Sequence, residues 1–176
     1  MNMNMNKKEI EQALSTLTLI IDTREHDTES SRHRIRNINL PYVRQKLDFG
    51  DYSCKITLSD GKEIDFSNIF AVERKMNIDE LALCFTSERE RFEREFIRAK
   101  DKNAKIYLLI ENSSWEQVIG GKYKSKMSSN ALVASIITWL IRYDCRIIMC
   151  DELVSWRIIK EILYREAKNY LNNSTL

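Results

Sequence analysis

The stretch "AVERKMNIDEL" at residues 71–81 runs from an apolar pair straight into three consecutive charged residues. Because side chains alternate along a strand, Glu73 and Lys75 would share one face and Arg74 would point to the other. Shortly afterwards the apolar spacing becomes that of an amphipathic helix, with Asp79 in its first turn. The stretch therefore predicts a buried strand that ends in charged side chains and leads into a helix.

Composition indicates one folded domain over residues 1–176, with a core at about 17–171. Hydrophobic residues make up 43% of the chain, and only four glycines and one proline interrupt it, which favours regular structure over disorder. The repetitive start, residues 1–6, is expected to be disordered. Lys and Arg total 28 against 26 for Asp and Glu, so any basic surface for nucleic acid has to be local.

Cysteine and histidine usage argues against a zinc site. The four cysteines show no C-x-x-C spacing, and only two histidines are present. The first residues show no apolar h-region typical of a signal peptide, and no apolar run is long enough to span a bilayer. We therefore expect buried, reduced thiols in a cytoplasmic protein that has no membrane partner.

Apolar periodicity predicts alternating strands and helices. The expected strands lie at residues 17–22, 42–48, 51–58, 69–75, 104–111 and 145–150, and the expected helices at 7–15, 78–85, 87–102, 131–143 and 151–171. The polar segment 23–37 is expected to be a loop with a short basic helix. The segment 131–143 is apolar nearly all round, which is typical of a buried helix. The pattern indicates an α/β fold, a mixed central sheet flanked by helices.

Acidic residues lie where three expected strands begin or end. Asp22 and Glu25 follow the first strand, Asp51 opens the third, and Glu73 closes the strand at 69–75. Neighbouring strands would bring these carboxylates to one sheet edge, where their repulsion calls for a cation. An all-oxygen cluster favours Mg²⁺ or Mn²⁺, which can activate water and neutralise charge on a phosphodiester. Lys75, on the same face as Glu73, is placed either to hold the attacking water or to stabilise the transition state.

These residues resemble the signature of the XPF/Mus81-type (ERCC4) nuclease domain, a branch of the PD-(D/E)XK superfamily. The family pattern G-D-x(n)-E-R-K-x-x-x-D is complete as Gly50, Asp51, Glu73, Arg74, Lys75 and Asp79, and the upstream D-x-R-E element as Asp22, Arg24 and Glu25. The resemblance keeps the family order over residues 17–150. It implies a restriction-endonuclease-like fold.

The resemblance also implies a role for each matching position. The catalytic residues would be Asp22, Glu25, Asp51, Glu73 and Lys75. The metal ligands would be Asp51, Glu73 and the backbone carbonyl of Arg74, with Asp22 as a further candidate. The supporting residues would be Arg24 and Arg74, which orient acids or meet phosphate, and Asp79, which braces the motif from the next helix.

The implied activity is that of a metal-dependent DNA endonuclease, selective for flap, fork or junction DNA in repair or recombination, with no nucleotide cofactor. The tandem helix-hairpin-helix module of many relatives is not expected after residue 150. The resemblance is therefore to stand-alone bacterial or phage-like members. Two alternatives stay open: an inactive DNA-binding or nuclease-partner subunit of the same fold, and a Holliday junction resolvase-like nuclease.

Two basic segments are candidates for DNA binding, because Lys and Arg neutralise phosphates without reading sequence. They contain Arg32, Arg34 and Arg36 in the first segment, and Lys122, Lys124 and Lys126 around Tyr123 in the second. The Tyr123 ring is a candidate to stack on a base. The last two helices offer an apolar face to a second copy, so a homodimer is one expected assembly. The residues of that face are Trp139, Trp156, Ile159 and Leu163.

Overall fold

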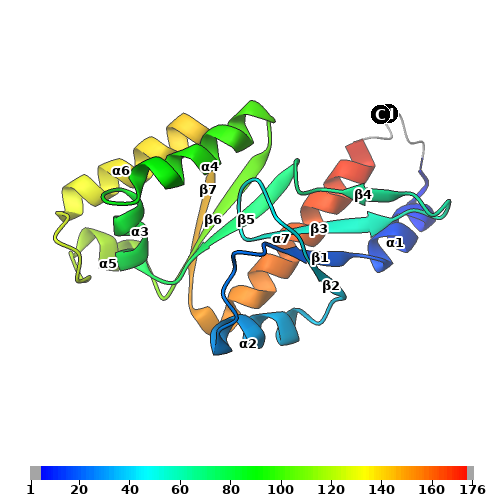
Figure 1. Cartoon of the computed structure of the whole chain (residues 1–176), viewed down its shortest axis with the longest axis horizontal. Coiled ribbons are helices and arrows are strands. Elements are labelled where there is room, and N and C mark those ends of the chain that lie inside the picture. Colours follow the sequence, from blue (N-terminus) through cyan, green and yellow to red (C-terminus); the bar gives the residue numbers. More distant parts are fainter. Residues whose placement is uncertain (1–4, 174–176) are drawn as a thin grey trace.

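The computed structural model describes residues 5–173, which form a seven-stranded mixed sheet between two layers of helices (Figure 1). The strands are β1 (Thr18–Ile21), β2 (Tyr42–Arg44), β3 (Tyr52–Thr57), β4 (Glu63–Asp65), β5 (Phe70–Lys75), β6 (Lys105–Glu111) and β7 (Arg146–Cys150). Their order is β2-β1-β3-β5-β6-β7, and β4 pairs with β3 outside this path. The mixed α/β sheet predicted from the sequence is confirmed.

Strand direction changes at β3, which runs antiparallel to both β1 and β5, whereas β5, β6 and β7 are parallel. Parallel neighbours need crossover connections, and helices supply them. The helices are α1 (Lys7–Ser15), α2 (Glu29–Ile38), α3 (Ile78–Cys84), α4 (Arg89–Asp101), α5 (Trp115–Ile119), α6 (Ser129–Tyr143) and α7 (Glu152–Asn173). The two faces of β5 are therefore covered by different helices.

Two hydrophobic cores lie on the two sides of the sheet. On one side, α1 and α7 pack over a cluster that contains Val72. On the other side, α3, α4 and α6 pack over a cluster that contains Ala71. The predicted dimer face is wrong for Trp139, Ile159 and Leu163, because these side chains are buried in the cores.

Helix α6 differs from its prediction, since it is not buried all round. Leu132, Ile136 and Trp139 are buried, but Ile137 is 41% exposed and Ile141 79% exposed. Apolar composition marked this segment as a helix without revealing that only one stripe of it meets the core.

Residues 5 and 6 of the predicted disordered segment lie within the described part of the chain. Residues 1–4 of the predicted disordered segment lie outside the described residues. Asn6 instead caps α1: its side chain accepts hydrogen bonds from the amides of Lys8 and Glu9, and the Glu9 carboxylate bonds the Asn6 amide. This capping box fixes the first turn of the helix.

The cysteines are free, with Cys54, Cys84 and Cys145 buried and Cys150 half-buried. Burial raises the pKa of the Cys84 thiol to about 11 and that of Cys145 to about 12, so neither forms a thiolate readily at neutral pH. Within residues 5–173, no helix is both long and apolar enough to cross a bilayer.

Candidate active site

Strand register brings the three predicted strand-end acids together. β1 pairs with β3 and β3 with β5 so that Asp22, Asp51 and Glu73 occupy neighbouring positions on three adjacent strands. The amide of Asp22 donates to the carbonyl of Asp51, and the amide of Asp51 donates to the carbonyl of Val72, each at 2.8 Å. The acids therefore converge at one sheet edge, as the sequence predicts.

Gly50 allows this close approach of strands. Its φ of +73° lies in the left-handed region, and a Cβ at this position would lie 2.7 Å from the Cβ of Ala71 and 3.2 Å from the carbonyl oxygen of Val72. Only glycine meets both demands without strain. The first residue of the G-D pair thus serves to set Asp51 against β5.

An open pocket lies at this edge of the sheet. Its walls are Asp51, Glu73, Arg74 and Lys75 from the strands, Arg24, Glu25 and His26 from the β1–α2 loop, Glu80 from α3, and Arg91, Phe92 and Glu95 from α4. Six of the nine residues predicted from the family motifs line it. Gly50, Asp22 and Asp79 do not, and each of these three has a structural contact instead.

Lys75 and Glu73 form the innermost ion pair of the pocket. The Lys75 Nζ lies 2.5 Å from Glu73 Oε1 and 5.0 Å from the centroid of the Phe92 ring. Burial lowers the pKa of Lys75, but attraction to Glu73 outweighs it and holds the pKa above its ordinary value. The lysine is therefore cationic at neutral pH.

The carboxylates beside Lys75 suit a hard divalent cation. Glu73 Oε2 is buried and accepts no hydrogen bond, and burial together with the charge of Glu73 raises the pKa of Asp51 well above its ordinary value. Among residues 5–173, no three His, Cys, Asp or Glu side chains form a complete metal cage. Magnesium commonly needs only one or two protein carboxylates, so Asp51 and Glu73 fit it.

Arg74 points to the opposite side of β5, into a buried ionic network. Its Nη1 lies 3.0 Å from Glu111 Oε2, and Arg34 Nη1 lies 2.7 Å from Glu111 Oε1. The Tyr52 hydroxyl donates to Glu25 Oε1 at 2.8 Å, and Arg34 Nε contacts the same hydroxyl at 3.3 Å. The network therefore connects α2 and the end of β6 to Glu25 at the pocket.

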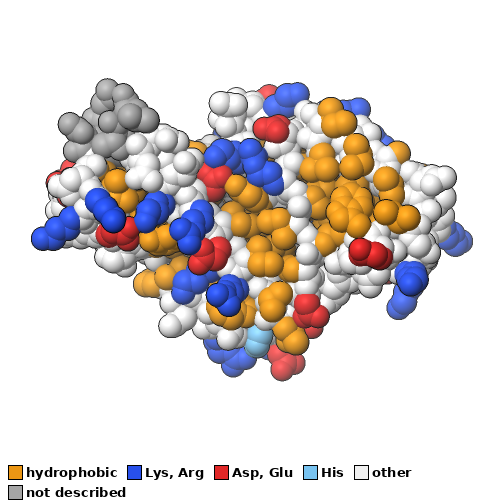
Figure 2. Space-filling view, turned by 180° about the vertical axis from the view of Figure 1, so that it is seen from behind, with side chains coloured by type: hydrophobic (Ala, Val, Ile, Leu, Met, Phe, Trp, Pro, Cys, Tyr) orange, Lys and Arg blue, Asp and Glu red, His pale blue; other side chains and the backbone are white. Residues whose placement is uncertain are grey.

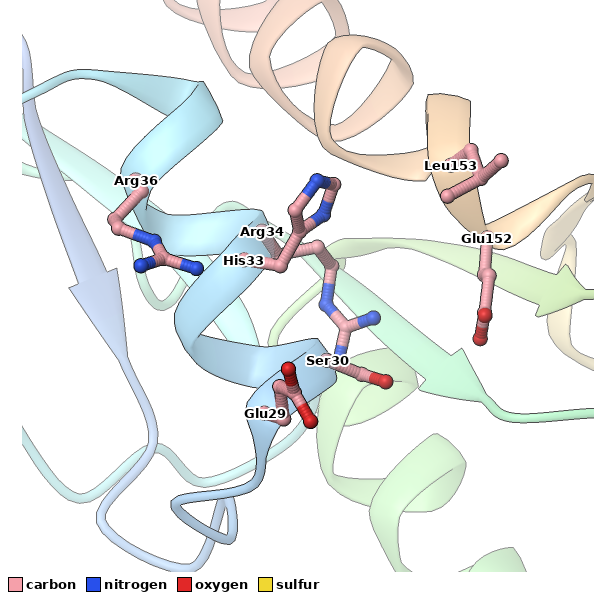
Figure 3. Close-up of a pocket in the computed structure, with 7 residues that line it drawn as sticks. All are labelled: Glu29, Ser30, His33, Arg34, Arg36, Glu152 and Leu153. Atoms are coloured by element: carbon pink, nitrogen blue, oxygen red, sulfur yellow. The ribbon is translucent and has the colours of Figure 1, made fainter.

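The prediction of Arg34 as a DNA contact is wrong. Its side chain is only 1% exposed and forms an ion pair with the buried Glu111. Figure 3 shows Arg34 and Arg36 leaving α2 on different sides. Arg36 is exposed, and so is Arg32, which pairs with Asp27 at 3.2 Å.

Asp22, whose role as a catalytic residue or metal ligand remains a prediction, accepts hydrogen bonds through both carboxylate oxygens. Its Oδ1 accepts from the backbone amide and the Nε of Arg24 at 2.7 and 2.8 Å, and its Oδ2 accepts from Arg24 Nη2 and from the amide of Leu47 at 3.1 and 2.6 Å. With both oxygens occupied, Asp22 orients Arg24, whose Nη1 meets Glu95 at 3.3 Å.

Asp79 was predicted to brace the motif on β5, but its carboxylate contacts another segment. Its Oδ1 accepts hydrogen bonds from the amides of Lys124 and Ser125, both at 2.7 Å. Tyr123 also differs from its prediction as a base platform: its ring packs against the core, and its hydroxyl donates to the carbonyl of Met127 at 2.9 Å. Both residues shape the loop between α5 and α6.

Five pocket residues were missed by the sequence reasoning: His26, Glu80, Arg91, Phe92 and Glu95. Burial and the nearby Glu73 raise the pKa of Glu95, which adds a further carboxyl group to the site. The available signal was the spacing of Arg91 and Glu95, four residues apart beside the buried Phe92 and Phe96. That spacing is equally typical of a solvated helix face.

Comparison with known proteins supports the assignment of the fold. A family model described as the ERCC4 domain matches residues 21–155. Two solved structures match with a TM-score of 0.61: "XPF from Aeropyrum pernix", at 15% identity over 85% of this chain and 61% of that one, and "XPF from Aeropyrum pernix, complex with DNA", at 18% identity over 87% and 66%. This chain thus spans less than two thirds of either matched chain. No curated protein matches significantly.

The family match runs from the end of β1 to the first turn of α7, which is more than half of the chain. It includes every residue of the D-x-R-E and G-D-x(n)-E-R-K-x-x-x-D elements described above. The chain therefore belongs to the ERCC4 domain family.

Proposed function

We propose that this chain is a divalent-metal-dependent DNA endonuclease, and that residues 17–171 form its single nuclease domain. The observation that carries the proposal is the pocket in which Asp51, Glu73 and Lys75 meet, with Glu73 Oε2 buried and unpaired. A buried carboxylate oxygen without a donor is costly unless a cation completes it.

In the proposed reaction the pocket residues hold the cation and the scissile phosphate. Asp51, Glu73 and the backbone carbonyl of Arg74 would bind Mg²⁺ or Mn²⁺, which when bound activates water and offsets phosphodiester charge. Lys75, held in place by Glu73 Oε1, presents a cation to the charge that develops on the phosphate. Glu25, fixed by Tyr52, extends the acidic side of the pocket.

Exposed basic residues supply the proposed DNA contacts. They are Arg32 and Arg36 on α2, and Lys122, Lys124 and Lys126 on the loop between α5 and α6. Contacts of this kind neutralise phosphates and position the backbone without reading base sequence. Together with the family membership, they support selectivity for DNA structure, at flaps, forks or junctions in repair or recombination.

The same chain is proposed to form a homodimer through a different apolar face from the one predicted. Figure 2 shows hydrophobic side chains gathered on the half of the rear face that carries α6 and β7. Ile137 and Ile141 on α6 are exposed, as are Leu153 and Val154 in the first turn of α7, and all five residues of the edge strand β7 are half-buried. Sedimentation equilibrium of wild type against Ile141→Glu tests this, since an unchanged mass would overturn it.

Cleavage of labelled DNA tests the proposed activity. Single-stranded, duplex, flap, fork and four-way-junction substrates would be incubated with Mg²⁺, Mn²⁺ or EDTA. Cutting should require the metal and should be lost in Asp51→Asn and Lys75→Met. Glu161→Gln, an exposed α7 position, is the matched control and should cut normally. Metal-independent DNA binding without any cutting would instead favour the inactive partner subunit.

A further inference from the structure

The loop between α5 and α6 presents three unpaired cations. We define residues 120–128 as the lysine loop, in which the side chains of Lys122, Lys124 and Lys126 are exposed. Within residues 5–173 none of these ammonium groups forms an ion pair. A cationic segment left without internal partners is suited to an anionic ligand such as a DNA backbone.

The backbone of this loop is held by a residue of the nuclease motif. Asp79 Oδ1 accepts both the Lys124 amide and the Ser125 amide at 2.7 Å. A carboxylate that accepts two backbone amides makes charge-assisted bonds, which are stronger than neutral ones. Further bonds within the loop tighten it: the Ser125 hydroxyl accepts from the Met127 amide at 3.2 Å. The tip is therefore tied to α3 rather than left as a free coil.

The first turn of α3 connects this loop to the pocket. Glu80, the residue after Asp79, lines the pocket, and its Oε2 accepts from the amide of Met76 at 2.6 Å. Met76 directly follows Lys75 on the chain. Two consecutive acids thus face different neighbours: Glu80 faces the pocket and Asp79 faces the lysine loop.

We infer that Asp79 is a positioning residue that fixes the lysine loop beside the pocket, so that its lysines bind backbone phosphates of the DNA strand next to the cleaved bond. The inference rests on the proposed function for the identity of the ligand. Ordering the loop before DNA arrives removes part of the entropic cost of binding. The loss of Asp79 would therefore weaken DNA binding more than it slows cleavage of DNA that is already bound.

Two substitutions at Asp79 separate this role from its charge. Asp79→Asn removes the charge but keeps the oxygen that accepts both amides, whereas Asp79→Ala removes both. The loss of a negative charge near DNA by itself strengthens binding. We therefore expect Asp79→Asn to bind DNA as tightly as wild type or more so, and Asp79→Ala to bind about tenfold more weakly, a change opposite in sign to the electrostatic effect.

The test measures DNA affinity over a salt series in EDTA, so that cleavage is not needed, and then KM and kcat with Mn²⁺. Asp79→Ala should lower the salt slope by about 1–3, since each lost phosphate contact removes about 0.9, and should raise KM with kcat within about twofold. The triple variant K122A/K124A/K126A should behave alike, and adding Asp79→Ala to it should weaken DNA binding no further.

The outcomes distinguish this inference from the proposed function. Equal affinity and salt slope for wild type and Asp79→Ala would overturn the inference, whether or not the wild type cuts DNA. Weakening by both Asp79→Ala and Asp79→Asn would also overturn it, because the accepting oxygen would then be irrelevant. A wild type that never cuts, combined with weakened binding in Asp79→Ala alone, would refute the nuclease and support the inference.

Discussion

The two faces of β5 differ in how they use charged side chains, although the residues of both faces alternate along the same six-residue strand. On one face, Glu73 and Lys75 border an open pocket in which a buried carboxylate oxygen has no donor. On the other, closed face, Arg74 enters a buried network in which both oxygens of Glu111 are taken by arginines, while Arg34 Nη2 and Arg74 Nε have no hydrogen-bond partner among residues 5–173. The first face leaves a carboxylate oxygen free to bind a ligand, whereas the charges on the second face pair with one another and hold the strand in place.

This difference separates chemistry from stability within a single motif. An open site keeps a carboxylate ready for a ligand at a cost in folding free energy. A buried ion pair contributes little net stability when complete, but breaking it leaves an unpaired charge. Substitutions on the open face should therefore mainly lower activity, and substitutions on the closed face should mainly lower the free energy of unfolding.

The largest effect is expected on the open face. Glu73→Gln removes the negative charge that the cation and Lys75 require, so cleavage should fall by at least about a thousandfold, roughly 4 kcal/mol of transition-state stabilisation. The variant relieves the repulsion with Asp51 but leaves the buried Lys75 without its carboxylate partner, so its free energy of unfolding should fall by less than that of the closed-face variant Arg34→Met below. Single-turnover cleavage and urea unfolding measure the two quantities. A loss of stability as large as that of Arg34→Met would show that the face is structural.

A smaller effect, of the opposite kind, is expected on the closed face. Arg34→Met leaves one oxygen of the buried Glu111 without its partner and should lower the free energy of unfolding by about 3–5 kcal/mol. Arg36→Met, on the exposed side of the same helix, should change it by no more than about 0.5 kcal/mol. Urea unfolding compares them. Equal stability of the two variants would mean that the network does not hold α2 to the sheet.

The smallest effect is expected at Gly50, where the chain packs closely against β5. Gly50→Ala adds a methyl group 2.7 Å from the Cβ of Ala71 at a positive φ, which should cost about 2–4 kcal/mol. Gly61→Ala also has a positive φ but meets nothing within 4 Å, so only the backbone term of about 1–2 kcal/mol remains. If the two variants unfold at the same urea concentration, the close packing of Gly50 on β5 contributes nothing.

Sequence patterns predicted the open face better than the closed one. Strand alternation placed Glu73 and Lys75 together, and acids at strand ends marked the sheet edge, because both signals are local. Arg34 was indistinguishable from Arg32 and Arg36 in a polar run. Its burial depends on Glu111, 77 residues further along the chain, and no local pattern encodes such a partner.

Other errors have the same origin in tertiary contacts. The hydrogen bonds from Arg24 and Leu47 to the two oxygens of Asp22 were likewise not predicted. Asp79 was assigned to the motif beside it, but its partners lie 45 and 46 residues away. Composition likewise could not tell which apolar residues of α6 meet the core and which reach the surface.

Calorimetric titration of Mn²⁺ into the wild-type protein and Glu73→Gln tests the central claim most directly, with Glu161→Gln as the control. The open face predicts saturable binding in wild type and control that is lost in Glu73→Gln while all three proteins remain folded. Equal binding by wild type and Glu73→Gln, or no binding by any of the three with or without uncleaved DNA, would contradict the claim that the unpaired oxygen of Glu73 is there to hold a metal.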